Sequence, residues 1–179
     1  MQRHILHSDI VDVPADAMIY STNIRLTLTG GVGVALLKKF GIGVQIALQN
    51  ASVGTGRHMA EVGDVFETTI SAAPWKKVFH TIATDELYHT NAEVVRSILQ
   101  RCLRRCLELD HVRNITCSAI GSGYGDLDLH VFASIAEDVC SQFEHTALNT
   151  FSIVSFDVSD YKKICEAASS VGRWIPKNG

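Results

Sequence analysis

Two glycine-rich stretches contain the residues best suited to binding chemistry, and each precedes an amphipathic segment. One reads Gly-Ser-Gly-Tyr-Gly at 121–125, and the other reads Gly-Gly-Val-Gly at 30–33. Glycine permits sharp turns and positive φ, so several backbone N–H groups of such a stretch can point at one anion. A single loop of this kind serves packing equally well. Two of them in a chain of 179 residues favour a phosphate or diphosphate ligand.

The elements around these stretches alternate between strand and helix patterns. Period-two or buried apolar runs predict strands, and apolar stripes at helical spacing predict helices. This alternation predicts a three-layer α/β domain, in which both glycine stretches open helices whose N-termini favour an anion. A dinucleotide fingerprint is excluded because its third glycine is missing after Gly33. The predicted strands are 3–7, 17–21, 64–69, 77–83, 114–118 and 151–156, and the predicted helices are 34–40, 42–50, 91–109, 131–143 and 160–168, with a flexible link at 54–56.

Composition limits the classes of partner. A net charge of −3 gives no field for capturing nucleic acid or an anionic membrane, so an anion must be held locally. The arginines on the polar face of the 91–109 helix are accordingly interpreted as a solvated surface. Five cysteines fall on apolar positions and are expected to be reduced core residues. We expect a cytoplasmic protein, or a nuclear one in a eukaryote, without a membrane segment.

Two polar side chains outside the glycine stretches stand out. Asn23 follows a predicted strand, at the edge where open α/β sheets bind ligands, although a turn asparagine bonded to its own backbone fits equally. His80 lies inside a predicted strand with no partner acid nearby in sequence, which favours a core histidine over a catalytic one.

Five motifs in order resemble the macro domain. They are Asp9-Ile10, Ser21-Thr22-Asn23, Gly30-Gly31-Val32, Val78-Phe79-His80 and the stretch Ala119–Gly125. The resemblance covers residues 1–168 and leaves 169–179 as a loose C-terminal tail. It implies a mixed, roughly six-stranded sheet between helices, and recognition of ADP-ribose or of ADP-ribosylated macromolecules.

The resemblance also implies roles for particular residues. Asp9 would accept a hydrogen bond from the adenine amino group, and Phe156 would stack on adenine. Asn23 would face the distal ribose, and Tyr124 would line the pocket around that ribose. The two glycine loops would enclose the diphosphate and that ribose. The ligand-binding residues expected on this basis are Asp9, Ile10, Asn23, Gly30, Gly31, Val32, Gly33, Gly121, Ser122, Gly123, Tyr124, Gly125 and Phe156.

Three departures from the family pattern bear on activity. Ser8 and Thr29 each replace a usual glycine, and Gly33 stands where one hydrolase branch carries a catalytic aspartate. Asp126 is then the best candidate acid or base, with Tyr124 and Asn23 as positioning groups. We therefore expect either a reader of ADP-ribose or a hydrolase that removes mono-ADP-ribose, and, more remotely, a nucleic-acid module on the arginine face. No metal or cofactor and a monomeric state are expected.

Overall fold

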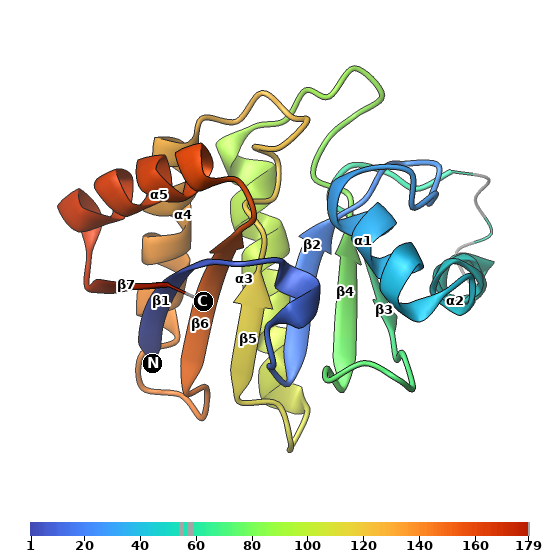
Figure 1. Ribbon diagram of the computed structural model, residues 1–179, viewed down its shortest axis with the longest axis horizontal. Helices are drawn as coiled ribbons and strands as arrows, with labels where there is room; N and C mark the ends of the chain where they lie inside the picture. Colours follow the sequence, from blue (N-terminus) through green and yellow to red (C-terminus); the bar gives the residue numbers. More distant parts are fainter. Residues whose placement is uncertain (54–55, 57–58, 179) are drawn as a thin grey trace.

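The computed structural model describes residues 1–53, 56 and 59–178. Strands and helices alternate along the chain, and the strands form one sheet with helices on both faces (Figure 1). The predicted three-layer α/β architecture is confirmed. The elements are β1 (Gln2–His7), a short 3-10 helix η1 (Ile10–Asp12), β2 (Ala17–Ser21), α1 (Gly31–Phe40), α2 (Gly43–Val53), β3 (Val65–Thr68), β4 (Lys77–Thr81), α3 (Ala92–Glu108), β5 (Asn114–Cys117), α4 (Leu129–Gln142), β6 (Thr150–Ser155), α5 (Val158–Val171) and β7 (Trp174–Asn178).

The sheet is mixed and runs in the order β3-β4-β2-β5-β6-β1-β7. Only β3 is antiparallel to its neighbour, and every other pair is parallel. The carboxyl ends of β1, β2, β4, β5 and β6 therefore meet at one edge. Seven strands are found where roughly six were expected, because the chain adds β7 at the outer side of β1.

Two apolar clusters fill the space between the layers. The larger packs α3, α4 and α5 against one face of the sheet, and the smaller packs α1, α2 and η1 against the other (Figure 1). Side chains alternate between these faces along each strand, so Ile19 of β2 joins the first cluster and its neighbours Met18 and Tyr20 join the second. Four of the five cysteines are buried and all five are free thiols, as predicted for core residues.

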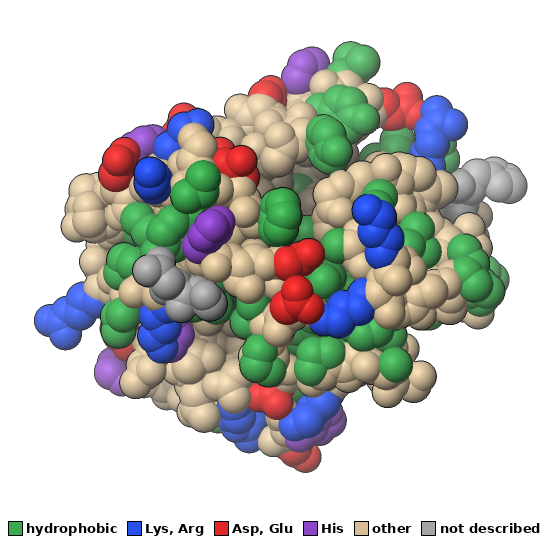
Figure 2. All heavy atoms as spheres, in the orientation of Figure 1, with side chains coloured by type: hydrophobic (Ala, Val, Ile, Leu, Met, Phe, Trp, Pro, Cys, Tyr) green, Lys and Arg blue, Asp and Glu red, His purple; other side chains and the backbone are tan. Residues whose placement is uncertain are grey.

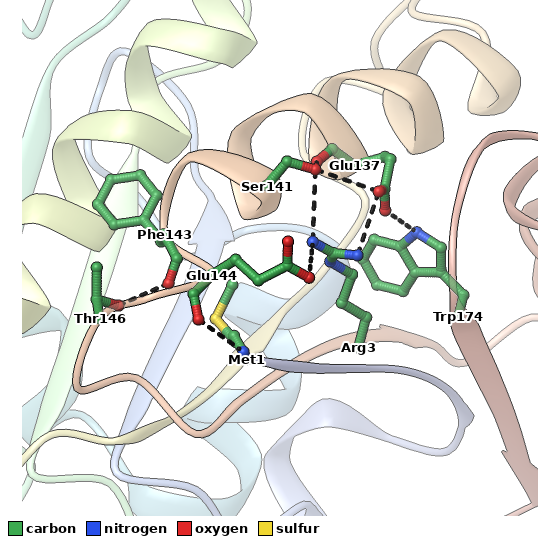
Figure 3. Close-up of polar contacts among 8 residues, drawn as sticks. All are labelled: Met1, Arg3, Glu137, Ser141, Phe143, Glu144, Thr146 and Trp174. Carbon is green, nitrogen blue, oxygen red and sulfur yellow. Dashed lines mark hydrogen bonds and ion pairs between the residues drawn. The ribbon is translucent and has the colours of Figure 1, made fainter.

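The prediction of a loose tail over 169–179 is wrong for most of that segment. Helix α5 extends to Val171, and Trp174–Asn178 pairs with β1 as a parallel edge strand. A polar network holds this end in place (Figure 3). Arg3 Nη1 lies 3.2 Å from Glu137 Oε1, and Trp174 Nε1 donates to Glu137 Oε2 at 2.9 Å. The pairing partners of β7 lie far away in sequence, so local patterning did not reveal this strand.

Helix boundaries differ from the predicted ones where glycine or capping side chains set them. Helix α1 begins at Gly31, three residues earlier than predicted, because the glycine stretch itself forms its first turn. Helix α3 begins at Ala92, one residue later than predicted, because Asn91 caps it by accepting a hydrogen bond from Val94 N at 3.0 Å. The predicted link at 54–56 lies mostly outside the described residues.

Within the described chain, no single helix is long and apolar enough to cross a membrane. Helices α1 and α2 satisfy the length and composition criteria only as a pair, and they are bent at 118° to each other.

Candidate functional site

The predicted site residues follow the carboxyl ends of neighbouring parallel strands. Asp9 comes shortly after β1, Phe156 directly after β6, and Asn23 shortly after β2. The stretch 121–125 follows β5, which lies between β6 and β2 in the sheet. The order of strands therefore places the predicted adenine residues at one end of this edge, the second glycine loop in the middle and Asn23 at the other end. Open α/β sheets bind ligands at this edge.

Asp9 and Phe156 lie side by side. The backbone N–H of Ser8 donates to Ser155 O at 3.0 Å, and His7 Nε2 contacts Phe156 O at 3.2 Å. Asp9 Oδ1 accepts from Val11 N at 3.1 Å and thereby caps η1, which buries Ile10. The Phe156 side chain is 78% exposed. A half-buried carboxylate thus stands next to a solvent-facing aromatic ring, a pair suited to reading and stacking on a base.

The first glycine loop presents the N-terminus of α1 to this edge. Gly30 is the N-cap residue and supplies no side-chain hydrogen bond to the helix. The N–H groups of Gly33 and Val34 bond back to Gly30 O, whereas those of Gly31 and Val32 have no backbone partner among the described residues. Free N–H groups at a helix start favour an anion. Gly33 is buried against Leu28, since a Cβ there would lie 3.1 Å from Leu28 Cα.

The second glycine loop is tightly folded at two glycines and open at the third. A Cβ at Gly125 would lie 2.2 Å from the carbonyl oxygen of Gly121, whose own φ is +82°. A Cβ at Gly123 would meet nothing within 4 Å, so this residue faces open space. Between them, Ser122 Oγ is buried without a hydrogen-bond partner in the described chain. Buried hydroxyls are rarely unpaired, and such a group marks a place where a ligand or water completes the bonding.

Tyr124 joins the two glycine loops. A Cβ at Gly30 would lie 3.0 Å from Tyr124 Cε2 and 3.3 Å from its hydroxyl oxygen. The ring is 72% exposed and also contacts Tyr88, with 6.0 Å between ring centroids. The structure therefore brings the two glycine loops into contact, with Tyr124 of the second loop against Gly30 of the first.

Asn23 shapes the first loop from within. Its amide oxygen accepts from Arg25 N, Thr27 N and Thr27 Oγ1 at 3.1–3.2 Å. Its Nδ2 donates to Thr27 O at 2.7 Å and to Thr29 Oγ1 at 3.4 Å. The amide hydrogen bonds of Asn23 are therefore those of an asparagine that shapes its own turn, which was the alternative to a ligand-binding role.

Asp126 connects the second loop to the segment after β4. Its Oδ1 accepts from Thr90 N at 2.9 Å, and its own N–H donates to Tyr88 O at 3.2 Å. Its Oδ2 makes no hydrogen bond to the described residues. Sequence reasoning missed Tyr88 and Thr90, whose roles arise only from this contact. The positive φ of Tyr88, 65°, has no sequence signal comparable to a glycine.

His80 is a core residue, as predicted. It is fully buried, with Tyr20 Oη at 2.5 Å from Nδ1 and Thr68 Oγ1 at 2.7 Å from Nε2. Burial lowers the pKa of His80 to about 3, so the imidazole is neutral at physiological pH. His80 therefore cannot act as an acid or base at the sheet edge.

Two hollows on the described surface lie away from this edge. One, of about 400 Å³, is lined by Arg101, Arg104 and Arg105 of α3 together with Glu67 and Glu108. Arg105 bonds both of these glutamates at 2.8 Å, which offsets its charge. Acidic and basic side chains are also interspersed on the face seen in Figure 2. In the described part of the chain, neither this hollow nor the face in Figure 2 carries charge of a single sign, so neither supports the remote nucleic-acid hypothesis. Among the described residues, no group of three or more His, Cys, Asp or Glu could hold a metal ion.

The sheet order and the two glycine loops define an α/β domain of the class that binds ligands at the carboxyl edge of its sheet. The Macro domain family model matches residues 19–136, more than half of the chain. The chain therefore belongs to the macro domain family.

The chain is also similar to curated relatives and, in its fold, to solved structures. An uncharacterized protein of Mycobacterium tuberculosis is 25% identical over 130 residues, which are 72% of this chain but 34% of that protein. The chain thus spans about a third of the length of the curated relatives it matches. An Oceanobacillus iheyensis macrodomain variant with ADP-ribose superposes with a TM-score of 0.80 at 20% identity, covering 93% of this chain and 91% of that one. The Trypanosoma brucei macrodomain in complex with ADP-ribose gives 0.77 at 21% identity, covering 96% and 69%.

Proposed function

We propose that this chain binds ADP-ribose, free or linked to a macromolecule, across the carboxyl edge of its sheet. The observation that carries the proposal is the convergence of the two glycine loops at Tyr124 and Gly30. The first N–H groups of α1, which have no backbone partner among the described residues, lie beside it. Solved macrodomains of the same fold have been determined with ADP-ribose. An acidic chain can hold a diphosphate in this way because helix N-termini and glycine-loop N–H groups supply the positive potential locally.

The adenine end of the proposed site is set by Asp9 and Phe156. Asp9 Oδ2, which makes no hydrogen bond to the described residues, is suited to accept from the exocyclic amine, while Oδ1 remains on Val11 N. A charge-assisted hydrogen bond of this kind contributes about 1.5 to 3 kcal/mol. Stacking of the base on exposed Phe156 adds about 1 to 3 kcal/mol. The hydrogen bond to Asp9 gives preference for adenine over a base that presents a carbonyl at that place, whereas stacking on Phe156 serves any base.

The site favours recognition over turnover. Gly33 has no acidic side chain to activate water, the Asn23 amide is engaged within its own loop, and Asp126 Oδ1 is bonded to Thr90 N. The second candidate function, hydrolysis, is favoured by one observation, the free Oδ2 of Asp126 next to Tyr124. In that reaction water adds to the anomeric carbon as its bond to the acceptor breaks, and the acceptor leaves with a proton.

A matched pair of asparagine variants tests the binding proposal by calorimetry. Asp9→Asn keeps a capping oxygen for Val11 N but replaces the acceptor facing adenine by a donor. We expect it to weaken ADP-ribose by about tenfold to a hundredfold without lowering the melting temperature. Asp12→Asn, on the same 3-10 helix, should bind as the wild type does. The hypoxanthine analogue should reverse the order, binding Asp9→Asn better than wild type. Absence of heat and of thermal shift with millimolar ADP-ribose would end the proposal.

A turnover assay separates the two functions. The protein is incubated with Glu-, Arg-, Ser- and nucleobase-linked mono-ADP-ribose, and released ADP-ribose is measured. A reader releases none from any linkage while still binding ADP-ribose in calorimetry. Release that Asp126→Asn abolishes, with binding retained, would instead establish hydrolysis.

A further inference from the structure

A second polar hollow lies on the sheet face that α1 and α2 leave uncovered. These helices lie over β2, β3 and β4, away from the amino-terminal halves of β1 and β6 (Figure 1). The connection that follows η1 lines one side of the hollow. The hollow has a volume of about 500 Å³. It is lined by His4 and Leu6 of β1, Thr150 and Ser152 of β6, Asn114 of β5, Lys177 of β7 and the connecting residues Val13, Pro14, Ala15 and Asp16.

Two nearly buried polar side chains without partners form its floor. His4 and Ser152 are register partners on adjacent parallel strands, so their side chains stand next to each other on this face. His4 is 7% exposed and Ser152 is 6% exposed. Neither side chain makes a hydrogen bond or an ion pair with any described residue. The polar atoms of both side chains open onto the hollow, so they are available to hydrogen-bond a ligand that enters it.

The charges at the rim distinguish an anionic ligand from a cationic one. Asp16, the acidic residue of the hollow, already has partners on both carboxylate oxygens. Lys76 Nζ lies 3.0 Å from its Oδ1. Its Oδ2 accepts hydrogen bonds from Arg113 N, Asn114 N and Asn114 Nδ2 at 2.9–3.0 Å. Its carboxylate has little capacity left for a cation. Lys177, at the opposite rim, has no described partner. Burial and the charge of Lys177 both lower the pKa of His4, so its imidazole is neutral and can donate one N–H.

We propose that this hollow binds an oxyanion, a carboxylate or a phosphate group, through Lys177 Nζ, the His4 imidazole and the Ser152 hydroxyl. These three hydrogen-bond donors come from three neighbouring strands and line the same hollow. On one side, the apolar side chains of Leu6, Val13 and Pro14 limit the access of water that would compete with the ligand for these donors. This site is separate from the carboxyl edge, because its floor residues lie in the middle of β1 and β6. It does not depend on the ADP-ribose proposal.

Proton NMR of the histidine rings tests it on the whole protein, with inorganic phosphate and acetate as separate probes and chloride at equal ionic strength as the reference. His4→Gln identifies the His4 signals among the eight histidines. We expect a saturable, millimolar shift of these signals by one or both probes and a rise in the pKa of His4 on binding. Phosphate alone would indicate a phosphorylated partner, and acetate alone an acidic peptide or metabolite.

Matched variants make the outcome specific. Lys177→Gln and Ser152→Ala should each weaken the shift by about tenfold, whereas Lys162→Gln, an exposed lysine of α5, should leave it unchanged. Ser152→Ala removes a hydroxyl that bonds none of the described residues, so its melting temperature should stay close to that of wild type. Equal shifts with chloride, no saturation, or full binding by Lys177→Gln would overturn the proposal.

Discussion

The Tyr124 ring lies directly over Gly30, so that a Cβ at Gly30 would stand 3.0 Å from Tyr124 Cε2. This contact joins two loops that are separated by about half of the chain. It also limits how far the loops can move independently, because the Tyr124 ring rests on Tyr88 as well. The geometry of the proposed diphosphate site therefore depends on residue 30 having no side chain.

Gly30→Ala should weaken ADP-ribose binding by about tenfold without unfolding the protein. Gly30 has φ −150°, an extended conformation that alanine adopts freely, so the expected effect comes from the Cβ pushing against the ring. Calorimetry on a double-mutant cycle with Tyr124→Ala checks this cause. The effect of Gly30→Ala should become smaller in the Tyr124→Ala background, whereas additive losses would contradict a direct contact.

Gly125→Ala should destabilise the fold by about 3 kcal/mol, because its Cβ would overlap the backbone carbonyl of Gly121 at 2.2 Å. Gly123→Ala is the matched control in the same loop. Its Cβ would meet nothing within 4 Å, so its free energy of unfolding should match that of wild type. Urea unfolding of the two variants measures the difference. Equal stability would mean that the loop does not hold the tight turn at Gly121–Gly125.

His80 should make the stability depend on pH in mildly acidic solution. Its pKa falls from 6.5 in the unfolded chain to about 3 in the fold, so between these values only the unfolded state binds the extra proton. The stability is complete above pH 6.5 and decreases by about 1.4 kcal/mol per pH unit below it. Between pH 7 and pH 5, wild type should lose about 2 kcal/mol more than His80→Gln.

Urea unfolding at the two pH values measures this difference. Burial raises the pKa of the Asp16 carboxyl, but Lys76 and two backbone N–H groups together hold that pKa below its ordinary value. This contribution is the same in both proteins and cancels. Equal losses in wild type and His80→Gln would contradict a neutral buried His80.

The sequence predicted the features that depend on local pattern. The glycine stretches, the first six strands in sequence and the five α-helices follow from residue spacing and glycine chemistry, and they were placed within a few residues. Features that depend on distant partners were missed. Strand β7 exists through its pairing with β1, and the role of Thr90 arises from Asp126, which lies 36 residues later. Asn23 could be placed at the sheet edge, but only coordinates distinguish its loop-forming hydrogen bonds from contact with a ligand.

The Arg3–Glu137 pair should be the most sensitive point of the β7 edge. Arg3 is 5% exposed and lies 3.2 Å from Glu137 and 3.3 Å from Glu144, while Glu137 also accepts from Trp174 (Figure 3). Glu137→Leu leaves a buried guanidinium partly uncompensated, and we expect a loss of about 3 kcal/mol.

The double variant Arg3→Met with Glu137→Leu should recover most of that loss, because apolar groups of similar volume replace both charges. Arg25→Met is the control, since its pair with Glu86 is exposed on both sides and should change stability by less than about 1 kcal/mol. Urea unfolding, with Trp174 fluorescence to follow the edge strand, measures all three. If the double variant has the same free energy of unfolding as Glu137→Leu, β7 requires the ion pair itself, and apolar side chains of similar volume cannot replace it.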